Sequence, residues 1–74
     1  MKVLLLMEET RTGYSAYAPD VPGCVATGPS VEETEGLMRE ALQFHLAGMR
    51  EAGSPPPEAT TLATWVEVSG LDVE

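Results

Sequence analysis

Apolar positions along this chain follow two periods, one typical of strands and one typical of a helix. Residues 2–8 form a short apolar run without alternation, which predicts a strand buried on both faces. Residues 14–18, 24–27 and 62–68 lie between turn-forming residues and predict three further strands. Because a short turn joins the first two strands, we expect them to pair antiparallel.

The segment before the last predicted strand has helix signals at both ends. Ser30 and Glu33 have the spacing of a capping box. Gly53 is a typical helix stop, and the prolines at 55–57 cannot continue a helix. Together these signals predict a helix over residues 31–52. The side chains expected on its apolar stripe are Val31, Leu37, Met38, Ala41, Leu42, Phe44, His45, Leu46 and Met49.

The predicted order is therefore β-β-β-α-β, an α+β fold with one antiparallel-rich sheet and one helix across one face. That single helix leaves the second face of the sheet uncovered. Side chains alternate along a strand, so Val3, Leu5 and Met7 should point to one face. Leu4 and Leu6 should point to the other. We therefore expect the open face or an edge strand to be buried in a homodimer.

Size and charge narrow the range of partners. The chain has 74 residues, which predicts a single domain over residues 1–74. Its net charge is −8, from 12 acidic and 4 basic residues. Nucleic-acid binding relies on a basic surface, so we expect none by this chain alone. An anionic membrane surface would repel it as well. The charge either suits a basic protein partner or simply keeps a small protein in solution.

Composition also limits cofactors and location. Cys24 is the only cysteine and His45 the only histidine, so neither an intrachain disulfide nor a Cys/His metal cluster is expected. The apolar run at residues 3–7 is too short to span a bilayer or to form most signal-peptide cores. We therefore expect a cytoplasmic protein without metal or other cofactors.

Residue patterns that support catalysis are missing from the sequence. It has no nucleophile elbow, no P-loop and no dinucleotide-binding glycine motif. His45 falls on the apolar helix stripe, and Cys24 is expected to be a small buried hydrophobe. Glu32, Glu33 and Glu35 point in different directions around one helical turn, so they favour a role in capping over metal binding. The sequence therefore predicts that the protein is not an enzyme.

One stretch of the sequence is typical of a known family. Residues 14–24 read YSAYAPDVPGC, an aromatic-rich strand followed by the pattern P-D-aliphatic-P-G-C. A small residue and a glycine follow at 26–28, and Ser30 then opens a Glu-rich helix. The combined pattern covers about residues 2–68 and resembles the N-terminal domain of HicB-like antitoxins.

This resemblance implies a partial RNase H-like fold of order β-β-β-α-β. A true RNase H carries a metal-binding aspartate in its first strand. The first strand predicted here has none, so the resemblance implies a fold without nuclease activity. It implies instead a partner, a small basic HicA-type toxin that cleaves mRNA, which the chain would occlude. Full-length members usually carry a C-terminal DNA-binding domain, for which residues 1–74 offer no counterpart. We therefore do not expect this chain to repress transcription alone.

Four acidic residues are candidates for contact with such a partner: Asp20, Glu32, Glu33 and Glu35. Solvated surface charge explains the same residues equally well. The alternative function is a stand-alone homo-oligomeric protein or small-ligand binder with no toxin partner. A neighbouring reading frame that encodes a short basic protein would favour the antitoxin.

Overall fold

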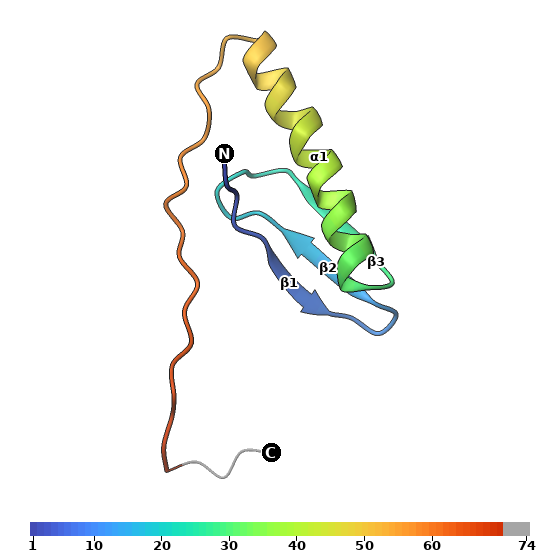
Figure 1. Cartoon of the computed structure of the whole chain (residues 1–74), viewed down its shortest axis with the longest axis vertical. Coiled ribbons are helices and arrows are strands. Elements are labelled where there is room, and N and C mark those ends of the chain that lie inside the picture. Colours follow the sequence, from blue (N-terminus) through green and yellow to red (C-terminus); the bar gives the residue numbers. More distant parts are fainter. Residues whose placement is uncertain (71–74) are drawn as a thin grey trace.

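The fold is a three-stranded sheet with one helix packed across one face (Figure 1). The computed structural model describes residues 1–70. The strands are β1 (Leu6–Glu9), β2 (Tyr14–Tyr17) and β3 (Val25–Gly28), and the helix is α1 (Val31–Glu51). Both strand pairs are antiparallel, in the order β1-β2-β3. The α+β class is confirmed, while the end of the predicted domain, residues 71–74, lies outside the described residues.

The strand register decides which side chains meet the helix. Met7 pairs with Ala16, and Ala16 pairs with Ala26, so the three share one face of the sheet. Ala16 is buried there, and the other two pack against the same cluster. The neighbouring row includes Tyr17 and Val25, which point to the opposite face and are exposed. The helix therefore covers one face of the sheet, and the other face stays open.

The core is small and consists largely of small side chains. Helix α1 contributes Thr34, Met38 and Leu42, which are spaced four residues apart. Met38 is fully buried and is the largest such side chain. Val3 and Leu5 pack against this core, as their alternation predicts. The complete set of buried residues is Ala16, Ala18, Val21, Cys24, Thr34, Met38 and Leu42.

Both ends of α1 are capped as the sequence predicts. The Ser30 hydroxyl accepts a hydrogen bond from the Glu33 amide at 3.1 Å and donates to the Glu33 carboxylate at 3.2 Å. At the other end, Gly53 has a φ of 77°. The amides of Gly53 and Ser54 donate to carbonyls of the last turn at 3.1 and 2.9 Å, which is a Schellman motif. The helix thus ends at Glu51, next to the predicted end at residue 52.

Replacing Ser30 with alanine is expected to lower the free energy of unfolding by about 1 kcal/mol. The substitution leaves the Glu33 amide without its side-chain acceptor. Urea denaturation followed by circular dichroism measures the change. Ser69→Ala is the control, because Ser69 is exposed on the segment that follows the helix, residues 54–70, which we call the C-terminal segment. Equal stabilities of the two variants would show that the cap contributes nothing.

The predicted apolar stripe of α1 is wider than the surface that the helix buries. Phe44 is 84% exposed, and Val31 and Leu37 are also exposed. Thr34, which the stripe did not include, is fully buried, and its hydroxyl donates to the Ser30 carbonyl at 2.7 Å. A Cβ added at Gly28 would lie 2.6 Å from the Thr34 hydroxyl, so glycine allows β3 to approach the helix this closely.

Three of the predicted strands form, but the first is shorter than predicted. β2 and β3 lie within one residue of the predicted ranges 14–18 and 24–27. The prediction that residues 2–8 form one strand is only partly right, because β1 begins at Leu6. Leu6 pairs with Tyr17, the last residue of β2, so the residues before it have no strand to pair with.

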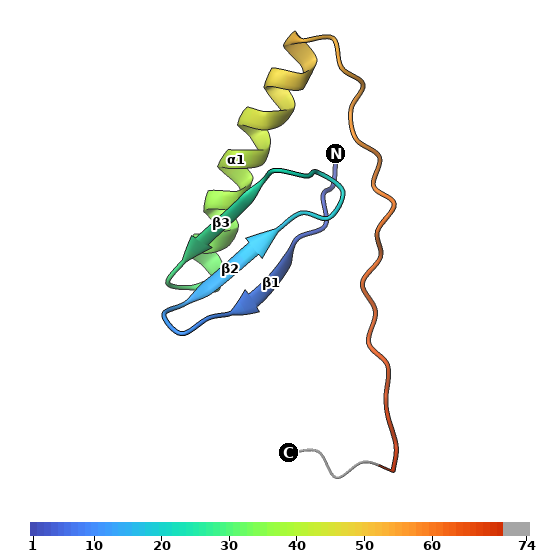
Figure 2. The same cartoon turned by 180° about the vertical axis from the view of Figure 1, so that it is seen from behind.

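The structure does not form the fourth strand predicted over residues 62–68. This segment runs extended beside the fold without joining the sheet (Figures 1 and 2). Leu62 is 91% exposed and Trp65 is 99% exposed. A strand is defined by hydrogen bonds to a neighbouring strand, and this segment has no such neighbour within residues 1–70. Residues 62–68 therefore form no strand within the single chain, although their composition favours one.

Candidate protein-binding surfaces

Three acidic residues lie exposed at the start of α1. Glu32 and Glu33 occupy the first turn, where negative charge is favourable to the helix dipole. Glu33 also takes part in the cap with Ser30. Glu35 lies 3.9 Å from Arg39, and both side chains are mostly exposed. The start of the helix therefore presents negative charge to solvent, and each carboxylate remains accessible to a partner.

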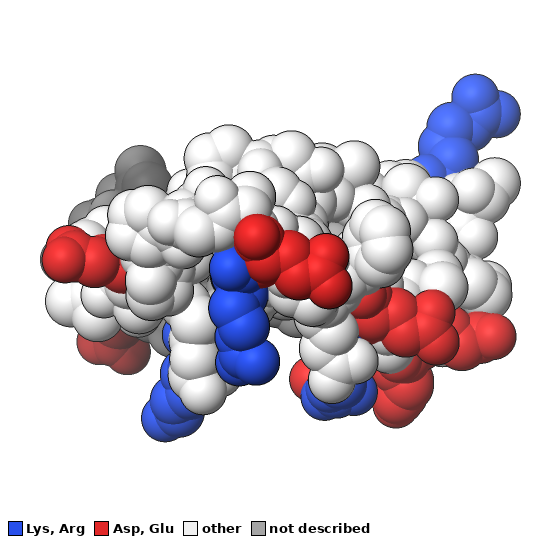
Figure 3. Space-filling model, turned by 90° about the horizontal axis from the view of Figure 1, so that it is seen from above, with Lys and Arg blue, Asp and Glu red and all other residues white. Residues whose placement is uncertain are grey.

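Acidic side chains outnumber basic ones over the whole chain, 12 to 4. In Figure 3 they form several separate groups, and basic side chains lie between some of them. Within residues 1–70, no three His, Cys, Asp or Glu side chains lie close enough together to hold a metal ion. On the face that Figure 3 shows, the negative charge is thus spread over several places, a distribution that suits long-range attraction to a basic molecule.

Asp20 holds the C-terminal segment against the loop between β2 and β3. Its Oδ1 accepts hydrogen bonds from the hydroxyls of Thr61, at 2.7 Å, and Thr60, at 3.2 Å. Its Oδ2 accepts the Thr61 amide at 3.3 Å. The Thr61 hydroxyl contributes most to lowering the pKa of Asp20 below its usual value, although partial desolvation opposes the shift. Sequence reasoning missed this contact because nothing local links residues so far apart.

The attachment of the segment is expected to depend on pH through Asp20. The pKa of the folded carboxyl lies below that of an unpaired one, so the contact is fully present above about pH 3.9 and is lost as the pH falls through the lowered pKa. The protection factor of the Thr61 amide, which is the exchange rate of an unprotected amide at the same pH divided by the rate measured by NMR, should therefore fall in acid. In Asp20→Asn the exchange should already be fast at neutral pH. Identical protection in both proteins across the titration would contradict this role.

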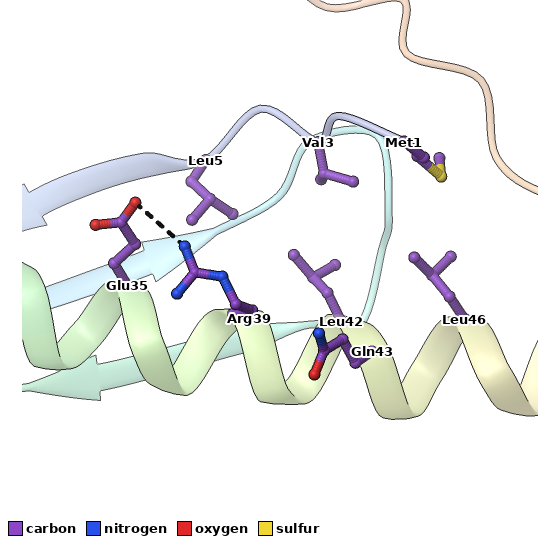
Figure 4. A pocket seen from close by; sticks show the side chains of 8 residues that line it. All are labelled: Met1, Val3, Leu5, Glu35, Arg39, Leu42, Gln43 and Leu46. Atoms are coloured by element: carbon purple, nitrogen blue, oxygen red, sulfur yellow. Dashed lines mark ion pairs between the residues drawn. The ribbon is translucent and has the colours of Figure 1, made fainter.

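An apolar groove runs between the N-terminal residues and α1 (Figure 4). Met1, Val3 and Leu5 line one side, and Leu42 and Leu46 line the other. The groove has a volume of about 350 Å³. A second hollow of about 330 Å³ shares two of these residues and continues toward the C-terminal end of α1.

The position of α1 explains why this groove is open. The helix packs mainly against β3 and β2, so the sheet edge formed by β1 is less covered. Three polar side chains on the helix complete the lining, namely Glu35, Arg39 and Gln43. The groove therefore has apolar side chains on both sides and additional polar side chains on the helix, a mixture that is common for surfaces that receive another polypeptide segment.

Three further candidate groups are a cysteine, a histidine and a tryptophan. Cys24 is buried, and its Sγ lies 3.9 Å from the Ala41 carbonyl oxygen, as expected of a small core residue. His45 is half-buried on α1. Trp65 lies on the C-terminal segment and is exposed, so it does not pack into the core of the chain. Among the described residues, the one helix is not apolar enough over a sufficient length to cross a membrane.

Comparison with known proteins gives consistent matches. Residues 3–71 match the family model described as HicB-like antitoxin of bacterial toxin-antitoxin system. The chain is 31% identical over 62 residues to an uncharacterized 14.9 kDa protein from the rep-hol intergenic region of Haemophilus phage HP1, covering 84% of the chain and 47% of the phage protein. It is 33% identical over 49 residues to a UPF0150 protein of Helicobacter pylori, covering 66% of the chain and 68% of that protein.

The chain therefore spans about half the length of the phage relative. No solved structure gives a significant match.

Proposed function

Because this chain belongs to the HicB-like antitoxin family of bacterial toxin–antitoxin systems, we propose that it binds a small basic HicA-type toxin and blocks cleavage of mRNA by that toxin. The observation that carries the proposal, beside family membership, is the net charge of −8 on a chain of 74 residues. An RNA-cleaving protein needs a basic surface to hold its substrate, and an acidic protein competes for that surface. The chain acts by occlusion in the cytoplasm and catalyses no reaction.

The start of α1 is the surface that we propose for this contact. Glu32, Glu33 and Glu35 are exposed there and lie within two turns of one another. Asp20 is the fourth proposed contact. It lies on the loop between β2 and β3, at the opposite end of the sheet from the start of α1 (Figure 1), so it would be a separate contact. Its carboxylate already accepts hydrogen bonds from Thr60 and Thr61, which limit its freedom to reorient. Charged groups in such positions speed encounter and select the partner more than they add to final affinity.

A direct binding experiment tests the proposal. The probe is a purified small basic HicA-type toxin, and isothermal titration calorimetry at low and at moderate salt is the measurement. We expect a complex with a Kd of about 1 μM or tighter. Absence of binding at about 0.01 M salt, where charges interact over roughly 30 Å, would exclude the toxin-covering role.

Self-association of the chain is the second part of the proposed function, with or without a toxin. The exposed apolar side chains of residues 62–68 favour it, as does the open face that carries Tyr17 and Val25. Sedimentation equilibrium at micromolar concentration should give twice the chain mass of 7.9 kDa. A monomer under these conditions would rule out the homodimer.

A further inference from the structure

The segment at residues 62–68 has the properties of a strand without a partner. Leu62, Val66 and Val68 share one side of the extended chain, and Trp65 lies on the other side. All four side chains are at least two-thirds exposed, with Trp65 at 99%. Both sides of the segment are thus apolar, a pattern that fits a strand inside a sheet and not a solvated tail.

The sheet has a matching open edge. The strand order β1-β2-β3 leaves β1 without a neighbour on its outer side within residues 1–70, so its backbone donors and acceptors there are available. The residues just before β1, from Lys2 to Leu5, pair with no strand on either side. The sequence nevertheless has the apolar character of a doubly covered strand over residues 2–8.

The groove beside this edge gives a place for side chains of an added strand. Val3 and Leu5 line it from the N-terminal segment, and Leu42 and Leu46 line it from α1. A strand next to β1 would direct alternate side chains toward this groove and toward the open face. Leu62, Val66 and Val68 would then enter the groove, and Trp65 would lie over the open face beside Leu4 and Leu6.

We infer that residues 62–68 of one copy of this chain pair with the β1 edge of a second copy, and that the two copies exchange these segments reciprocally. Such an exchange closes a twofold dimer with two identical strand additions. It deepens the proposal of a homodimer by naming the surface, and it does not depend on toxin binding. Each half of the dimer then has the β-β-β-α-β arrangement that the sequence predicts.

The dimensions of the single chain support a second copy as the occupant. The radius of gyration is 15.3 Å, whereas a compact chain of this length has about 11 Å. The chain exposes 6221 Å², whereas a compact protein of its mass exposes about 4,400 Å². The excess of roughly 1,800 Å² per chain exceeds the ~800 Å² that each partner buries in a standard interface.

The connection to the helix also favours exchange. Prolines at 55–57 stiffen the connector, and the Asp20 hydrogen bonds fix its end at Thr60 and Thr61. Beyond this point the segment runs alongside its own fold without pairing (Figures 1 and 2). Both the segment and the edge therefore remain available to another molecule.

The first experiment compares two variants of the full chain by sedimentation equilibrium. Val66→Glu places a charge on the side that enters the groove, and we expect it to shift the dimer toward monomer by at least tenfold in Kd. Ala59→Glu adds the same charge on the exposed connector and should leave the dimer intact. The helical circular dichroism signal of each variant checks that α1 is retained. Equal Kd values for the two variants would overturn the exchange.

The second experiment identifies which chain provides the strand. Two tagged chains, both carrying Cys24→Ala, bear Lys2→Cys and Glu67→Cys respectively. They are refolded together and treated with a short bismaleimide cross-linker. Exchange predicts a product that joins the two different tags.

Three outcomes would overturn the inference. If the mixture gives no product while a chain carrying both new cysteines links internally, then the segment closes on its own sheet. If a dimer forms but the cysteines at positions 2 and 67 are linked neither between chains nor within one chain, then the two copies associate through another surface. If the link between tags appears only after the basic toxin-type protein is added, then the segment serves the toxin complex and not the homodimer.

Discussion

Replacing Met38 with alanine is expected to lower the free energy of unfolding by about 2–5 kcal/mol, which is most of the stability of this domain. Met38 is fully buried, and its neighbours in the core include the small side chains Ala16 and Ala18. Small neighbours cannot move far enough to fill the cavity. A single core in a chain this short supplies only about 3–5 kcal/mol. Urea denaturation at fixed protein concentration measures the loss, since the proposed dimerisation would make stability concentration-dependent.

Phe44→Ala is the matched control for this prediction. It removes a larger side chain from the same helix, but Phe44 is 84% exposed and we expect a change within about 0.5 kcal/mol. A stability of Met38→Ala equal to that of Phe44→Ala would mean that α1 does not pack on the sheet as described.

Neutralising the acidic start of α1 is expected to slow association with the basic toxin by about tenfold at low salt, with little change in the dissociation rate. The variant is Glu32→Gln combined with Glu33→Gln and Glu35→Gln. Glutamine can still accept from Ser30, so the capping box is preserved. The exposed pair of Glu35 and Arg39 is worth little to stability. Stopped-flow fluorescence over a range of salt concentrations measures the association rate.

A second triple variant separates local charge from total charge. Glu40→Gln, Glu51→Gln and Glu58→Gln change the net charge by the same amount at exposed positions away from the first turn of the helix. We expect this control to slow association less than the helix-start variant. Equal effects at every salt concentration would show that only total charge matters and would remove the helix start as the contact surface.

The sequence predicts α1 well because its limits depend on local chemistry. The hydroxyl of Ser30 and the positive φ of Gly53 act within one turn of the chain. The same local rules give wrong predictions of which helix side chains are buried, because burial depends on what packs against each side of the helix. Phe44 has helical spacing with the apolar stripe but lies on a flank that no strand covers, whereas the polar Thr34 is buried because Gly28 leaves it space.

Strand pairing is the part that the sequence cannot assign. The composition of residues 62–68 gives β propensity, but propensity does not identify the neighbour that supplies the hydrogen bonds. Pairing also explains why β1 is shorter than predicted: β2 ends at Tyr17, which pairs with Leu6, so the residues before Leu6 have no partner in β2. Likewise, Asp20 is recognisable from sequence only as a loop charge. Its contact with Thr61 depends on the path of the connector, which no local pattern determines.

Inhibition of RNA cleavage tests the central claim most directly. A small basic HicA-type toxin is incubated with RNA and increasing amounts of this chain, and an unrelated acidic protein of similar charge serves as the control. We predict that cleavage falls in proportion to the chain added and stops near stoichiometric amounts, while the control leaves it unchanged. Undiminished cleavage in the presence of excess chain at low salt would contradict the account.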